Sequence, residues 1–143
     1  VKASILPILA ALAVGSPFAI ISAAGIAWGL GAAEPIILAL VPKSVTAGIA
    51  VGIAEEIGGE PALTAVLVIC TGILGAVIVT PLMNAMKITD YAARGFAAGL
   101  TSHGIGTARA FQVSSVAGTF SGLAMALNGL TTAVLTPIFF SLL

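Results

Sequence analysis

The chain has 143 residues, of which 59% are hydrophobic and only 7% charged, and its five basic and five acidic residues balance to zero net charge. A soluble domain is about 25% charged, so this composition excludes a water-soluble protein and predicts an all-α integral membrane protein surrounded by the lipid bilayer. Zero net charge provides no basic surface for a nucleic acid, which is therefore not an expected partner.

Three segments are long and apolar enough to cross a bilayer, which takes about 20 residues of helix. They cover about residues 3–30, 61–86 and 119–143, and none of them contains a charged residue. Pro61 suits the first turn of the second segment, where its missing N–H is not needed. The first segment is not a signal peptide, whose apolar core is only about 7–15 residues long. We therefore treat residues 1–143 as a single polytopic membrane domain.

Two further segments, about residues 34–58 and 90–118, are long enough to span the membrane, yet polar and helix-breaking residues interrupt both. The interruptions read LVPKSVTAG (residues 40–48) and LTSHGIGTARA (residues 100–110). Pro42 disfavours a continuous helix in the first, and Gly104 and Gly106 loosen the second. Non-helical backbone at membrane depth survives only where protein buries it or water reaches it. The sequence therefore predicts two broken helices that line a cavity and meet near the middle of the protein.

The two broken segments form a weak internal repeat, because a full span follows each of them. When Lys43 is aligned with His103, TGILGAVIVTP (residues 71–81) resembles NGLTTAVLTP (residues 128–137), which is one residue shorter. The positive-inside rule favours two re-entrant broken helices that enter from opposite faces, with residues 55–60 outside and residues 87–94 inside. The alternative, in which the broken segments cross the membrane, stays open because few basic residues decide it.

The interruptions gather side chains that suit a small organic anion. A helix that restarts after a break presents free N–H groups and a partial positive charge, and we expect such starts at Ser44 and Thr46 and at Thr107. The planar fork of Arg109 matches a carboxylate, and we expect it to face the same opening as His103. The candidate substrate-binding residues are Lys43, Ser44, Thr46, Ser102, His103, Gly104, Gly106, Thr107 and Arg109.

Purely structural roles stay open for the same residues. Lys43 and Arg109 could extend to the membrane interface, and His103 could hydrogen-bond a broken helix end. A cation near the middle of a span costs at least about 2.5–3.5 kcal/mol, which favours a functional role for Arg109. Asp90 is typical of a helix N-cap, and Arg94, one turn later, is typical of an interfacial anchor.

An enzyme is not expected. Ser102 and His103 are adjacent in the chain, so their side chains rarely adopt the geometry of a nucleophile and its base, and no acid within the segment orients the histidine. The chain has one histidine and one cysteine, Cys70. A metal site of these residue types is therefore not expected, nor is a cofactor, and an intrachain disulfide cannot form.

Glycines spaced four residues apart recur along the chain. Such spacing lets helix backbones approach closely. Tight packing within one chain explains the pattern, and a homo-oligomer stays open as the alternative. The pairs are Gly25–Gly29, Gly48–Gly52, Gly95–Gly99 and Gly118–Gly122.

Two blocks of sequence resemble the LrgB family of membrane proteins, also called CidB-like or YohK-like. They are LVPKSVTAGIAVGIAEEIGGEPALTAVLVICTGILGAV (residues 40–77) and ARGFAAGLTSHGIGTARA (residues 93–110). The plastidal glycolate/glycerate translocator has a similar domain. The chain departs from the family pattern at residues 46–48, where Thr-Ala-Gly replaces Thr-Thr-Pro. Family members usually have further N-terminal spans, so we expect this chain, which starts at Val1, to be a piece of a longer protein.

The resemblance implies a multi-pass protein of the bacterial inner membrane with a holin-like partner of the LrgA/CidA type. It also implies one of two functions. The first is transport of a small carboxylate such as pyruvate or glycolate, and the second is antiholin-like control of murein hydrolase export and lysis. A carboxylate carrier needs a cation inside the membrane, whereas a regulator that acts by assembly alone does not. The basic residues in the interruptions therefore favour transport.

Overall fold

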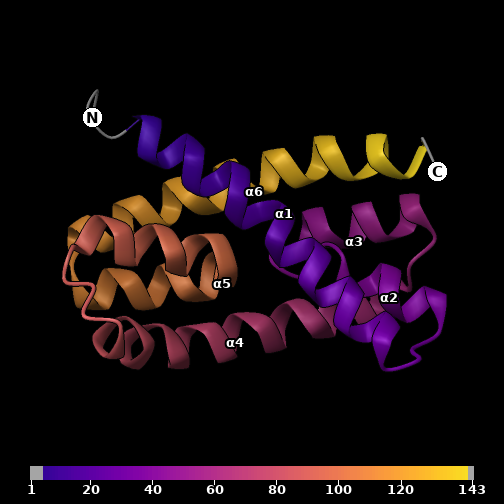
Figure 1. Cartoon of the computed structure of the whole chain (residues 1–143), viewed down its shortest axis with the longest axis horizontal. Helices are drawn as coiled ribbons and strands as arrows, with labels where there is room; N and C mark the ends of the chain where they lie inside the picture. The colour runs from indigo at the N-terminus through magenta and orange to yellow at the C-terminus, as the bar shows by residue number, and fades with distance from the viewer. Residues whose placement is uncertain (1–4, 142–143) are drawn as a thin grey trace.

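The computed structural model describes residues 5–141, with side chains described as far as residue 138, and every element in that part of the chain is an α-helix. Figure 1 shows an elongated bundle in which α4 runs along one side and α1 crosses the others. The helices are α1 (Ile5–Gly29), α2 (Glu34–Leu40), α3 (Ala47–Ile57), α4 (Pro61–Ala85), α5 (Tyr91–Val113) and α6 (Ser115–Ser141).

Three of these helices have the length and composition of membrane spans. They are α1, α4 and the part of α6 from Ser115 to Ile138. At about 1.5 Å per residue, the 25 residues of α4 extend about 37 Å, which exceeds the roughly 30 Å of a bilayer core. Large apolar side chains such as Phe18 and Val77 are exposed on α1 and α4, as expected for a lipid-facing surface. The chain is therefore a multi-pass membrane protein. Residues 3–4 and 142–143 of the expected spans lie outside the described residues.

The starts of α4 and α5 follow directly from their sequences. Pro61 occupies the first turn of α4, and the Glu60 carboxylate accepts hydrogen bonds from the N–H groups of Ala62 and Leu63. Asp90 caps α5 in the same way, because its Oδ1 lies 2.7 Å from the N–H nitrogen of Ala93. The prediction of an N-cap at Asp90 is confirmed.

The first broken helix is interrupted where Pro42 predicts it. Helix α2 ends at Leu40 and α3 begins at Ala47, and residues 41–46 form a compact link that we call the α2–α3 turn. Backbone hydrogen bonds from Lys43 to Leu40 and from Val45 to Pro42 hold this turn together. Most of the turn is buried, so protein rather than lipid surrounds the non-helical backbone.

The second broken helix is interrupted at His103, whose φ is 40° and ψ is −132°. We expected Gly104 and Gly106 to provide this break, but both have helical geometry and the only positive φ in α5 belongs to the histidine. A positive φ in a non-glycine residue is strained, and the ψ of His103 also lies outside the left-handed helical region. We call this point the α5 bend.

The α5 bend turns the helix back on itself. A Cβ atom on Gly106 would lie 2.7 Å from the carbonyl oxygen of Ala98, so residues 104–113 return beside residues 91–102. Ala98 and Ala110 accordingly share a small core cluster with Ala117 of α6. In Figure 1 the two arms of α5 lie side by side and both reach the end of the bundle where α6 begins.

Glycines allow α6 to lie directly against the first arm of α5. A Cβ atom on Gly95 would collide with the carbonyl oxygen of Ala117, and one on Gly99 would collide with that of Ser121. The Gly95–Gly99 pair therefore serves packing within the chain. By contrast, a Cβ on Gly25, Gly29, Gly48 or Gly52 would meet no heavy atom within 4 Å. Close packing within this chain does not explain these two pairs, so a homo-oligomer stays a prediction.

The two broken helices point into the molecule from opposite ends. In Figure 1, α2 and α3 occupy the end where α4 begins, and α5 occupies the end where α4 finishes. Glu55, Glu56 and Glu60 accordingly lie near the start of α4. Lys87 follows its C-terminal end, and the Arg94 side chain bonds Thr80 and Asn84 near that end. This geometry agrees with the expected separation of acidic and basic ends. Re-entry of the broken helices into a membrane stays a prediction, as does the placement of the acidic end outside the cell.

The packing predicts that the contact between α5 and α6 tolerates no side chain at Gly99. Gly99→Ala places a methyl group against the Ser121 backbone, and overpacking of this kind destabilises by about 1–3 kcal/mol. Gly25→Ala is the control, since it adds a methyl group in open space and should leave stability unchanged or improve it by up to about 1 kcal/mol. Unfolding by denaturant in detergent measures both, and equal stability of the two variants would contradict this packing.

Re-entry can be tested by labelling single cysteines from one side of the membrane, after Cys70, which is exposed, is replaced by alanine. The variants are Glu34→Cys, Glu56→Cys and Lys87→Cys, all at exposed positions. We expect a membrane-impermeant maleimide added outside to label the first two and not the third. If positions 34 and 56 react from opposite sides, the first broken segment crosses the membrane and is not re-entrant.

Candidate functional site

The side-chain amide of Asn128 joins the α2–α3 turn to the region of the α5 bend. Its Nδ2 donates to the carbonyl oxygen of Ser44 at 3.2 Å and to that of Leu100 at 3.1 Å. Asn128 lies on α6 and is 2% exposed. The two interruptions therefore meet inside the protein, as the sequence predicts, and a third helix holds them together.

Asn128 compensates for backbone groups that the breaks leave unpaired. The last four carbonyls of a helix lack partners within it, and Leu100 is within four residues of the α5 bend. A buried carbonyl without a hydrogen-bond partner costs about 1–3 kcal/mol of stability. One amide that donates to two such carbonyls therefore stabilises the fold. The Oδ1 of Asn128 is buried with no hydrogen-bond partner in the described part of the chain. Our sequence reasoning missed this residue, although an asparagine inside an apolar span is the signal that would have found it.

His103 is buried and held by α4. Its Nε2 lies 2.9 Å from the carbonyl oxygen of Val68, which requires the tautomer that carries the proton on Nε2. The ring fits against α4 only because residue 72 is glycine, since a Cβ there would lie 2.7 Å from the ring's Cε1. This contact, rather than a neighbouring glycine, accounts for the bend at His103.

Ser102 and Thr107 lie on either side of the same bend. Ser102 is fully buried against Gly75 of α4, where a Cβ atom would collide with its hydroxyl. The hydroxyl of Thr107 donates to the carbonyl oxygen of His103 at 2.8 Å. The same hydroxyl lies 2.9 Å from the hydroxyl of Ser121 on α6. Ser102 and Thr107 therefore hold the bend between α4 and α6, and their role in binding a substrate stays a prediction.

The two helix starts at the interruptions differ in part from our expectation. The second arm of α5 restarts directly after His103, so its free N–H groups belong to residues 104–106 and not to Thr107 and Ala108. Helix α3 begins after Thr46, whose exposed side chain makes no capping hydrogen bond. A Cβ atom added at Gly48 or Gly104 would have no heavy atom within 4 Å, so there is open space beside both residues. Both helix starts are therefore accessible to a ligand.

Lys43 supplies the positive charge beside the first helix start. It is half-buried, and its one side-chain hydrogen bond in the described part of the chain runs from Nζ to the Ser44 hydroxyl at 3.1 Å. Ser44 is itself buried and bonded through its carbonyl to Asn128. The structure thus brings Lys43 and Ser44 to the Asn128 junction, and among the described residues no acidic side chain pairs with this cation.

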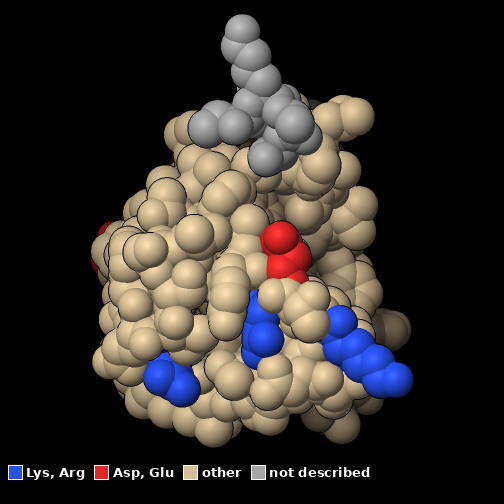
Figure 2. Space-filling view, turned by 90° about the vertical axis from the view of Figure 1, so that its left-hand side faces the viewer, with Lys and Arg blue, Asp and Glu red and all other residues tan. Residues whose placement is uncertain are grey.

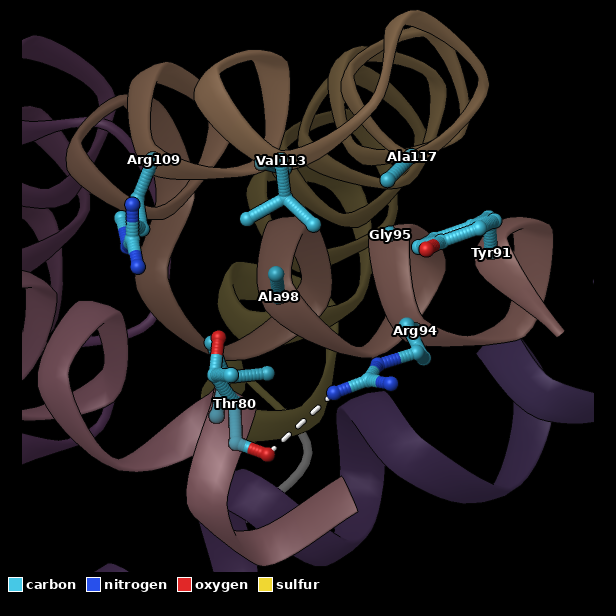
Figure 3. A pocket seen from close by; sticks show the side chains of 10 residues that line it. Thr80, Tyr91, Arg94, Gly95, Ala98, Arg109, Val113 and Ala117 are labelled. Carbon is cyan, nitrogen blue, oxygen red and sulfur yellow. Dashed lines mark hydrogen bonds between the residues drawn. The ribbon is translucent and has the colours of Figure 1, made fainter. Parts of the chain in front are cut away.

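Arg109 does not face the opening at His103, and the expectation that it does is wrong. Its side chain is exposed, and its Nη1 donates to Gln112 Oε1 at 3.3 Å. Figure 3 shows Arg109 beside a separate hollow that also holds Arg94, at the end of the bundle where α5 begins and ends. The reason is the fold-back of α5, which carries residues 104–113 away from the bend.

The comparisons of this chain with known proteins agree on one protein family. The profile of the LrgB-like family matches residues 1–142. YwbG of Bacillus subtilis (strain 168) is 45% identical over 130 residues, which are 91% of this chain and 58% of YwbG. Holin-like protein CidB of Staphylococcus aureus (strain N315) is 31% identical over 108 residues, 76% of this chain and 47% of CidB. The chain thus spans about half the length of these relatives. No solved structure matches it.

We predict that the two interruptions depend on Asn128. Asn128→Ala leaves the buried carbonyls of Ser44 and Leu100 without a donor, which should cost about 2–6 kcal/mol at about 1–3 kcal/mol for each group. Thr119→Ala is the control on the same helix, because the exposed Thr119 hydroxyl bonds only the carbonyl of Ser115. Denaturant unfolding in detergent compares them, and an Asn128→Ala protein as stable as the control would rule out the bridging role.

Proposed function

Because the chain belongs to the LrgB-like family, we propose that it forms part of an inner-membrane transporter for a small carboxylate, with pyruvate and glycolate as the candidates. The observation that carries the proposal is the meeting of two broken helices at Asn128, beside a half-buried lysine. Opposed broken helices that meet near the middle of a membrane domain are typical of secondary transporters.

Two kinds of group at this junction favour an anion. The starts of α3 and of the second arm of α5 present free N–H groups and the positive ends of their helix dipoles. Lys43 adds a full charge beside the first of them. A carboxylate has two oxygens, so it can accept from an ammonium group and from backbone N–H groups together.

The remaining polar residues of the junction position the site and do not face the ligand. His103 and Ser102 pack into the glycines of α4, and Thr107 bonds the His103 carbonyl and Ser121. Their hydrogen bonds hold one strained backbone conformation at the α5 bend. A fixed conformation of this kind lowers the cost of ordering the helix start when an anion arrives.

A second candidate is an antiholin-like regulator of murein hydrolase export, acting with a holin-like membrane partner of the LrgA/CidA type. The observation that favours it is the name of the relatives, Holin-like protein CidB, which supports this function more directly than it supports transport. The exposed apolar faces of α1 and α4 offer area on which a partner helix could pack. Transport and regulation can also coexist, if the regulator responds to the carboxylate that it moves.

We expect Lys43→Met to lower uptake of labelled pyruvate or glycolate into proteoliposomes by at least about ten-fold, because a charge-assisted contact worth about 1.5–3 kcal/mol is lost. Lys87→Met is the control, since Lys87 is exposed beyond the end of α4. Secreted murein hydrolase activity of cells that carry either variant separates the two candidates. Wild-type uptake by Lys43→Met would remove Lys43 from transport, and the absence of uptake by any variant, with altered hydrolase activity, would favour the regulator.

A further inference from the structure

The hollow that holds Arg94 and Arg109 is distinct from the Asn128 junction. It lies between the end of α4, both arms of α5 and the start of α6, and Tyr91 and Thr80 also line it. Figure 3 shows the two arginines on opposite sides of the hollow, with their guanidinium groups directed toward α4. The fold-back of α5 creates this pair, because residues 94 and 109 would be about 22 Å apart along a continuous helix.

Both guanidinium groups keep unused donors. Arg94 is half-buried, and its Nη2 donates to the Thr80 carbonyl at 3.3 Å and to Asn84 Oδ1 at 2.6 Å. Arg109 uses only Nη1, toward Gln112. An arginine has five N–H donors in a planar fork, so each retains several that could meet a further acceptor.

No acidic side chain neutralises this pair within the described residues. The nearest acid in sequence, Asp90, uses its carboxylate to cap the start of α5. Figure 2 shows that basic side chains gather on this end of the molecule, with an acidic side chain close to them. Two like charges that share one hollow repel each other, and an anion between them would relieve that repulsion.

We propose that Arg94 and Arg109 together bind an oxyanion, either a carboxylate or a phosphate, at the basic end of the bundle. The hollow is partly open and its cavity volume is about 20 Å³, which is room for about one water-sized group. The site therefore accepts the oxygens of a charged head group and leaves the rest of the ligand outside. Guanidinium forks match both anions with parallel hydrogen bonds.

This ligand chemistry has two sources at a membrane surface. One is the phosphate of an anionic lipid, which basic residues at the ends of membrane helices attract. The other is a free anion, such as a carboxylate on its way to or from the membrane. The oxyanion site does not rest on the proposed transport function, because Lys43 and the Asn128 junction have no part in it.

Native mass spectrometry of the protein in an uncharged detergent tests the proposal. Phosphatidylglycerol is the lipid probe, phosphatidylcholine is the zwitterionic comparison, and acetate and inorganic phosphate are the competing free anions, with chloride at equal ionic strength. The variants are Arg94→Gln and Arg109→Gln. Lys87→Gln is the matched control, because it removes the same charge from the same end but does not line the hollow.

We expect each arginine variant to weaken phosphatidylglycerol binding by about ten-fold or more, and Lys87→Gln to weaken it much less. Displacement by acetate or phosphate, but not by chloride, would identify free anions as ligands of the site, whereas resistance to displacement would identify the lipid head group. Equal losses in all three variants would mean that only net charge matters and would overturn the proposal, as would no loss in either arginine variant.

Two further results distinguish loss of the oxyanion site from misfolding and from failure of the transport proposal. Arg94 links α5 to α4 through Thr80 and Asn84, so Arg94→Gln could impair folding. Within the described residues the Arg109 side chain bonds only Gln112 on its own helix, so Arg109→Gln should fold. The Arg109 variant alone is therefore sufficient to contradict the site. Lys43→Met should bind phosphatidylglycerol like the wild type, which separates failure of this site from failure of the transport proposal.

Discussion

The two hydrogen bonds donated by Asn128 are the interaction on which the rest of the structure depends. Two helices break inside a membrane protein, where water does not readily reach the freed carbonyls. One amide on α6 donates to a carbonyl of each break, those of Ser44 and Leu100. The interruptions are thus joined through α6 to each other, and the buried carbonyls of Ser44 and Leu100 both gain a donor.

Small residues on the neighbouring helices make this junction possible. Gly72 and Gly75 of α4 leave the space into which His103 and Ser102 pack, and Gly99 lets α6 approach α5 closely enough for its polar side chains to reach the breaks. Without a strong hydrophobic driving force between helices in lipid, such close contact and the hydrogen bonds it permits supply much of the stability. The strained backbone of His103 is held by the same contacts.

Positive charge is divided between two places that differ in their surroundings. Lys43 lies half-buried at the junction, next to the start of α3, whereas Arg94 and Arg109 lie at the end of the bundle where α5 folds back. The two places therefore support separate proposals, transport at Lys43 and an oxyanion site at the two arginines.

The sequence by itself determined the class of protein, the three apolar spans and the presence of two interruptions, because composition, apolar length and helix-breaking residues are local properties. It also placed the first turn of α4 at Pro61 and the N-cap of α5 at Asp90. Only the tertiary structure decided that the second break falls at His103, since a bond to Val68 and the space above Gly72 select it over the adjacent glycines. Tertiary structure likewise gave Asn128 its role and moved Arg109 away from the junction, because both depend on where a folded-back helix places residues that are distant in sequence.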